Sequence, residues 1–180
     1  MKDIIWKTGV VQDGVAQAAP NGTDEKLKRI VRAVPGHSVL LDPAGVTETD
    51  TYLGLDGMSH FKVKSDERID MDQAPSGLGH LAAGIAFCYM TQIGRYSHMA
   101  KLPLEAYRVV QDLHFTLGGA SGGSGEGGTA DPVETHVFVD ADISTDAIRD
   151  VVRVAEKTCF LHALCRDRAK VKIRRDPISR

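Results

Sequence analysis

The sequence has no apolar run long enough to cross a membrane. The uncharged stretch LAAGIAFCYM, at 81–90, is about half of the roughly 20 residues that a membrane-spanning helix needs. The N-terminal residues, MKDIIWKTGVVQDG, lack the long apolar core of a secretory signal peptide. These absences predict a soluble, cytoplasmic protein without a membrane partner.

A strong charge of either sign is also missing. The formal net charge is −2, which gives no electrostatic reason to expect nucleic acid or an anionic membrane as a partner. Hydrophobic residues make up 42% of the chain and charged residues 26%, as in ordinary globular proteins. At 180 residues, the chain is long enough for one domain with a substantial core.

Cysteine is scarce and its spacing excludes several kinds of site. The three cysteines are Cys88, Cys159 and Cys165. An odd number without an export signal argues against a framework of structural disulfides. No CxxC is present, which argues against a zinc ribbon and a thioredoxin-type motif.

A glycine-rich segment, GGASGGSGEGGTADP at 118–132, resembles a phosphate-binding loop only in composition. It lacks the lysine that follows the glycines in a P-loop and that contacts the phosphates. The segment is therefore interpreted as a flexible connection between two strands of a hairpin.

The remaining segments predict a mixture of strands and helices. A β-rich region is expected over the first 70 or so residues, and helices are expected from about Leu78 to Lys101 and from Ser144 to near Cys165. Strands are expected at 4–11, 38–41, 51–55, 59–64, 108–117, 133–140 and 169–174. This order predicts an α+β domain in which two helices pack on antiparallel sheet.

Two of the cysteines fall on apolar stripes of the two expected helices. Cys88 follows Leu81 and Ile85 at spacings of four and three, and Cys159 follows Val152 and Ala155 in the same way. Both can be small buried hydrophobes, because free cysteine is among the most buried residue types. Alternatively they form a redox pair, in which one thiolate attacks an oxidant and the other resolves the sulfenic acid.

Metal binding is a third reading of the C-terminal cysteines. Cys159, His162 and Cys165 follow one another at intervals of three residues, so their side chains turn progressively around a helix. Three such positions rarely converge on one ion, and no metal site is expected from them.

The sequence resembles the OsmC/Ohr family of thiol-dependent peroxidases. The resemblance rests on Pro75-Ser76, on LAAGIAFC ending at Cys88, and on AEKTCFLHAL around Cys159. It covers roughly residues 58–175 of a single domain spanning 1–180, with 1–57 as a divergent β-rich segment. The order of strands, cysteine-bearing helix, hairpin and second cysteine-bearing helix also fits.

This resemblance implies a fold and an activity. The implied fold is an intertwined α+β homodimer with its sites at the subunit interface. Cys88 aligns with the residue that attacks an organic hydroperoxide, and Cys159 with the residue that resolves it. The implied reductant is a dithiol such as a lipoyl group, with no metal or nucleotide cofactor. An OsmC-like module that binds a small hydrophobic ligand at the interface pocket, without peroxidase activity, is the alternative.

The sequence departs from the family pattern just before the first cysteine. Family members usually have a glutamate nine or ten residues upstream, which holds an arginine against the thiolate. Leu78 and Gly79 occupy those positions, and neither side chain accepts a salt bridge. Candidates for the activating cation are Arg32, Arg68 and Arg95, and without one the thiol keeps a pKa near 8.5.

Overall fold

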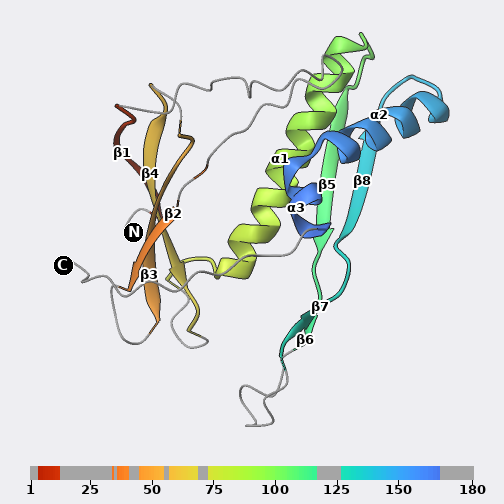
Figure 1. The fold of residues 1–180 in the computed structure, drawn as a ribbon. Coiled ribbons are helices and arrows are strands. Elements are labelled where there is room, and N and C mark those ends of the chain that lie inside the picture. Colours follow the sequence, from red (N-terminus) through yellow and green to blue (C-terminus); the bar gives the residue numbers. More distant parts are fainter. Residues whose placement is uncertain are drawn as a thin grey trace, which may run out of the picture. The chain divides into compact units, whose positions relative to one another are not determined.

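The structure is a computed structural model that describes residues 4–12, 34, 36–40, 45–54, 57–68, 73–116 and 127–166. Eleven elements are assigned in these residues, and Figure 1 labels them in chain order. The chain divides into two compact units, Met1–His80 and Leu81–Arg180. The predicted strand at 169–174 lies outside the described residues.

The first unit contains a four-stranded antiparallel sheet in the order β1-β4-β3-β2. The strands are β1 (Ile5–Val10), β2 (Gly36–Leu40), β3 (Val46–Tyr52) and β4 (Ser59–Asp66). In β3 every second residue is threonine, a β-branched type that favours strands. The prediction of a β-rich N-terminal region is confirmed, although β3 begins five residues before the expected 51–55 strand.

Helix α1 (Gly77–Met99) follows this sheet and confirms the helix predicted from Leu78. Its start is fixed by the Glu67 carboxylate, which accepts a hydrogen bond from the backbone N–H of Gly77. Its end precedes Lys101, which has a positive φ of 55°, and Pro103 follows. The buried face differs in part from the predicted stripe of Leu81, Ile85 and Cys88, because Leu81 and Cys88 are only half-buried. The buried residues are Ile85, Tyr89, Ile93 and Ser97.

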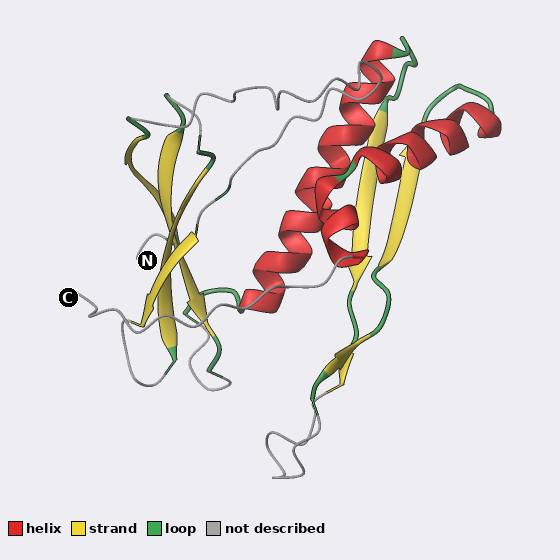
Figure 2. Ribbon diagram, viewed as in Figure 1, coloured by secondary structure: helices red, strands yellow, loops and turns green. Residues whose placement is uncertain are grey.

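A long antiparallel ladder joins β5 (Ala106–Asp112) to β8 (Glu134–Asp140), and β6 (Phe115–Thr116) pairs with β7 (Thr129–Ala130) beyond it. Figure 2 shows these pairs as one extended hairpin. The hairpin is therefore as predicted. The end of the glycine-rich segment forms β7, and residues 118–126 lie outside the described residues. The strand expected at 108–117 is found as β5 and β6, with a break between them at Leu113 and His114.

The second predicted helix is divided in two. Helix α2 (Thr145–Thr158) begins at Ser144, whose side chain accepts from the backbone N–H of Ala147, and α3 (Phe160–Arg166) begins after Cys159. One continuous helix to Cys165 was the wrong expectation. The Thr158 hydroxyl donates to the Val154 carbonyl at 2.8 Å, which competes with the backbone ladder in the last turn.

The core of the second unit lies between the helices and the β5–β8 ladder. Its fully buried members come from α1, α2 and their junction with α3, namely Tyr89, Ile93, Val151, Ala155 and Cys159. Partly buried residues from the ladder, including Tyr107, Val109 and Val137, pack against them. Figure 1 shows α1 alongside β5 and α2 crossing the ladder. The α+β class, with helices packed on antiparallel sheet, is confirmed.

Candidate active site

Cys88 is placed by the middle of α1. It is half-buried, and it packs against the core cluster that contains Tyr89 and Cys159. One position before it, Phe87 is 70% exposed, so Cys88 lies at the boundary between the buried and the open faces of the helix. A thiol at such a boundary is held by packing and can still be approached from outside.

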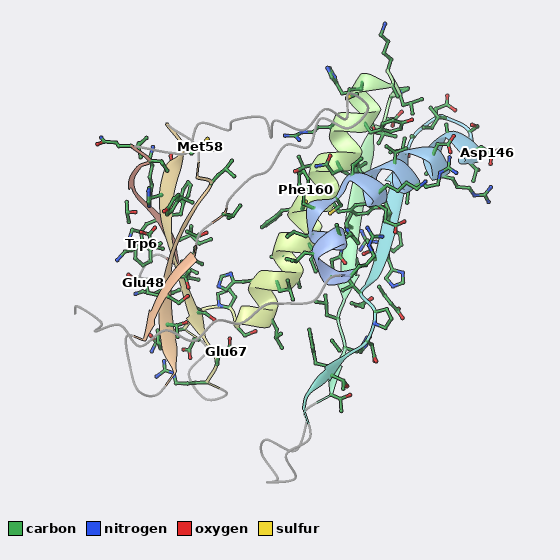
Figure 3. The ribbon with its side chains drawn as sticks, viewed as in Figure 1. Trp6, Glu48, Met58, Glu67, Asp146 and Phe160 are labelled. Atoms are coloured by element: carbon green, nitrogen blue, oxygen red, sulfur yellow. The ribbon has the colours of Figure 1, made fainter. Side chains whose placement is uncertain are left out.

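Cys159 is placed by the break between α2 and α3. It ends α2 in an extended conformation, with φ −75° and ψ 116°, and its side chain is turned into the core, where the residue is only 1% exposed. The next residue, Phe160, is 65% exposed and marks this junction in Figure 3. Leu161 and His162 follow in the first turn of α3.

The Cys88 side chain packs against the cluster that contains Cys159, and neither cysteine is in a disulfide. Burial raises the pKa of the Cys159 thiol, and the neighbouring Cys88 raises it further, whereas the backbone N–H groups of His162 and Leu161 lower it. The net direction is upward. Cys159 therefore keeps its proton at neutral pH, and Cys88 is the more accessible of the two sulfurs.

The cations considered from the sequence have other surroundings. Arg68 binds Asp66 through two guanidinium nitrogens, each 2.8 Å from a carboxylate oxygen. This pair holds the pKa of Asp66 well below its usual range. Arg95 is exposed on α1, and Arg32 lies outside the described residues.

The residues at the position of the missing glutamate are arranged at the start of α1. Leu78 is 50% exposed. Gly79 donates its backbone N–H to the Ser76 hydroxyl at 3.1 Å, which caps the helix. His80 is bonded through Nε2 to the carbonyl oxygen of Lys64 at 2.8 Å. These contacts fix the start of α1. Where family members usually have the glutamate carboxylate, this chain has groups that cap the helix.

Several polar residues around Cys159 were missed by the sequence reasoning. Tyr89 donates its hydroxyl to the Val152 carbonyl at 3.1 Å, and burial raises the pKa of Tyr89 to about 12. Its ring packs edge-on against that of His162, with centroids 4.8 Å apart. His162 was considered only as a metal ligand or a helix-edge residue. Alternation along the two strands places Gln111 and Thr135 on the inner face of the hairpin. The sequence could therefore have indicated these polar neighbours of His162.

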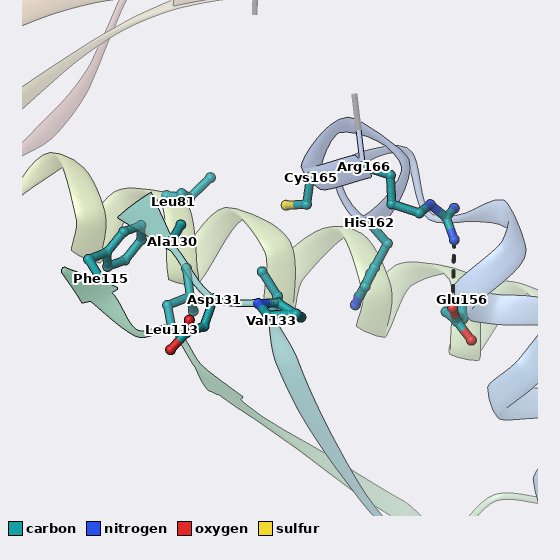
Figure 4. A pocket seen from close by; sticks show the side chains of 11 residues that line it. Leu81, Leu113, Phe115, Ala130, Asp131, Val133, Glu156, His162, Cys165 and Arg166 are labelled. Atoms are coloured by element: carbon teal, nitrogen blue, oxygen red, sulfur yellow. Dashed lines mark ion pairs between the residues drawn. The ribbon is translucent and has the colours of Figure 1, made fainter. Parts of the chain in front are cut away.

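A pocket of about 590 Å³ opens beside this site in the second unit (Figure 4). Its apolar wall includes Leu81, Leu113 and Phe115, and its other end holds His162 and an ion pair between Arg166 and Glu156 at 3.7 Å. Cys165 also lines it, whereas Cys88 and Cys159 do not. The pocket and the thiol pair are thus neighbouring features that share the ring of His162.

Two further kinds of site were tested against the residues that the structure describes. Within them, no group of three or more His, Cys, Asp or Glu side chains could hold a metal ion. None of the helices assigned to them is long and apolar enough to span a membrane.

The family model for OsmC-like proteins matches residues 70–174, which is more than half of the chain. The chain belongs to the OsmC-like protein family. The match includes both Cys88 and Cys159 and begins just before α1. OsmC/Ohr family peroxidases use no prosthetic cofactor. A comparison with curated proteins found no significant match.

Solved structures share the fold of this OsmC-like chain at low identity. An organic hydroperoxide resistance protein OsmC from Legionella pneumophila is 16% identical, with a TM-score of 0.52 over 76% of this chain and 89% of that one. An OsmC-like protein from Mycoplasma pneumoniae is 13% identical, with a TM-score of 0.51 over 71% and 89%. A hypothetical protein from Aquifex aeolicus VF5 is 9% identical, with a TM-score of 0.52 over 77% and 89%.

We expect His162 to make the protein lose stability as the pH falls below 6.5, the usual pKa of histidine. Burial lowers the pKa of His162 below its usual 6.5, against a smaller opposite effect of Glu156. The unfolded chain therefore takes up a proton first, and the contribution is complete above pH 6.5 and is lost as pH falls towards the folded pKa. Urea unfolding at several pH values should show a shallower pH dependence for His162→Gln.

The matched control for this pH experiment is His114→Gln, at an exposed histidine outside the core. It should leave the pH dependence as in the unsubstituted protein. An identical slope for His162→Gln and the unsubstituted protein would show that His162 is not the titrating group.

Proposed function

We propose that this protein is a thiol-dependent peroxidase that reduces organic hydroperoxides to alcohols. The supporting observation is the meeting of two cysteine sulfurs from separate elements, one half-buried on α1 and the other buried at the α2–α3 junction. Packing alone does not require two cysteines from separate elements in one cluster. A sulfenic acid formed on Cys88 would have its resolving thiol already in contact.

The proposed cycle has three steps. The Cys88 thiolate attacks the outer oxygen of the hydroperoxide, the O–O bond breaks, and the alkoxide leaves and takes a proton to give the alcohol. The Cys159 sulfur then attacks the Cys88 sulfenic acid, the S–S bond forms, and hydroxide leaves and takes the Cys159 proton to give water. An external dithiol reduces the disulfide by two exchanges and becomes a cyclic disulfide itself.

The wider features of the proposal follow the family. The proposal includes a lipoyl-type dithiol as electron donor, an intertwined homodimer, a cytoplasmic location and a single OsmC-like domain over 1–180. The Legionella pneumophila protein of the same fold is described as an organic hydroperoxide resistance protein, which agrees with this substrate class. The pocket beside Cys159 has an apolar wall, which suits the organic substituent of a hydroperoxide.

Thiol counting after peroxide treatment tests the proposal. One equivalent of cumene hydroperoxide should reduce the count from three thiols to one, and peptide mapping should find a Cys88–Cys159 disulfide. In Cys159→Ser the oxidation should stop at a sulfenic acid on Cys88, which dimedone traps. Cys165→Ser is the matched control and should still form the disulfide.

Thiols that stay reduced at one equivalent of peroxide would contradict the peroxidase proposal. That result would instead favour the alternative function, an OsmC-like module that binds a small hydrophobic ligand at the dimer-interface pocket.

A further inference from the structure

The inner face of the β5–β8 ladder carries three cross-strand pairs of different chemistry. Two of them are apolar or aromatic, Tyr107 with Val139 and Val109 with Val137. The third pair, at the end nearest α3, is Gln111 with Thr135. Packing alone would favour apolar residues at this third pair as well, so its polar side chains need an explanation.

These two side chains and His162 form a hydrogen-bonded chain. Thr135 donates its hydroxyl to Gln111 Oε1 at 2.8 Å, and His162 Nε2 lies 2.9 Å from the Thr135 oxygen. The single hydroxyl proton of Thr135 is used on Gln111, so the Thr135 oxygen accepts from His162 Nε2–H. The chain therefore fixes one neutral tautomer of His162, with its proton on Nε2 and none on Nδ1.

This hydrogen-bonded chain leaves two buried polar atoms unsatisfied. Within the described residues, the buried Gln111 Nε2 and His162 Nδ1 have no hydrogen-bond partner. A buried polar atom without a partner destabilises the folded state, because its contact with water is lost and not replaced. An apolar replacement would avoid that cost, which points to a purpose other than stability.

What the chain holds is the first turn of α3. The ring of His162 is fixed between Thr135 on β8 and the edge-on ring of Tyr89 on α1. His162 is three residues after Cys159, in the first turn of α3, and Cys159 is the residue at which α2 ends. Fixing the ring therefore also fixes the junction that places the reacting sulfur.

We propose that Gln111, Thr135 and His162 are positioning residues that hold the Cys159 sulfur in place for disulfide formation. This inference rests on the proposed peroxidase function. During resolution, the Cys159 sulfur loses its proton as it bonds to the Cys88 sulfur. When a dithiol then attacks the accessible Cys88 sulfur, Cys159 leaves as a thiolate. Closure of the disulfide needs the two sulfurs in line and in contact, so a fixed Cys159 speeds this step.

Rapid-quench mass spectrometry of Thr135→Val and Thr135→Ser tests the inference. Valine has the shape of threonine without the hydroxyl, and serine keeps the hydroxyl. Sulfenic acid formation on Cys88, which depends on peroxide concentration, should be unchanged in both variants. The peroxide-independent closure to the Cys88–Cys159 disulfide should be about tenfold slower or more in Thr135→Val, because small misplacements of reacting groups have effects of this size. In Thr135→Ser it should return to within about twofold.

The outcomes separate this inference from the function on which it rests. Absence of sulfenic acid on Cys88 in every variant overturns the peroxidase function itself. Normal sulfenic acid formation with an unchanged closure rate in Thr135→Val overturns the positioning role alone. Equal slowing of both steps overturns it too, because a general loss of structure affects both. Independently of peroxide, ¹⁵N NMR should show His162 protonated on Nε2, and an Nδ1-protonated ring contradicts the chain.

Discussion

Replacement of Cys88 by serine is expected to lower the rate of organic hydroperoxide reduction by at least about 10³-fold, to the background of the free dithiol. Loss of a covalent nucleophile has effects of this order or larger in enzymes whose chemistry depends on it. A serine hydroxyl stays protonated at neutral pH and forms no sulfenic acid. The rate should be followed as loss of cumene hydroperoxide with reduced lipoamide as donor.

Cys165→Ser is the matched control for this kinetic experiment. Cys165 is exposed on α3, outside the core cluster that joins Cys88 to Cys159, so its replacement should leave the rate within about twofold. The reverse pattern, with activity lost in Cys165→Ser and kept in Cys88→Ser, would move the reacting thiol to Cys165. Equal turnover in all three proteins would mean that no cysteine of this chain reacts with the peroxide.

Truncation of Ile93 to alanine is expected to destabilise the protein by about 3 kcal/mol, because buried Ile→Ala changes cost 2–5 kcal/mol. Ile93 is 0% exposed and lies in the cluster with Tyr89, Val151, Ala155 and Cys159. The change leaves a cavity beside both helices, and total stabilities are only about 5–15 kcal/mol. The midpoint of urea unfolding should fall with an unchanged denaturant slope.

A substitution at the other end of the exposure scale serves as control on the same helix. Met99 is 77% exposed at the end of α1, and Met99→Ala should change stability by less than about 0.5 kcal/mol. If the two variants unfold at the same urea concentration, Ile93 is not in a tightly packed core, and the cluster around Cys159 needs revision.

Local patterns in the sequence were sufficient for the elements and their order. Alternation and turn signals placed strands close to β1, β2, β4 and β8, and three- and four-residue spacings placed α1 and α2. The exact face of α1 was less well determined. Its residues are apolar on several sides, so periodicity alone did not show that Tyr89 and Ile93 would be the buried ones.

The candidate site was only half accessible to sequence reasoning. Cys88 and Cys159 were singled out by their places on apolar stripes and by the family pattern. Their contact depends on how α1 packs against the α2–α3 junction, which is a long-range property. The break at Cys159 was also hidden, because Thr158 and its neighbours are compatible with a continuous helix until the side-chain hydrogen bond to Val154 is seen.

The sequence by itself determined the family, the α+β class and the two cysteines, because these depend on residue identity and local spacing. Only the tertiary structure decided what surrounds each thiol. Burial raises the pKa of Cys159, and that burial exists only after the helices pack. The chain from Gln111 through Thr135 to His162 likewise requires two strands and a helix to meet, and no spacing along the sequence encodes that meeting.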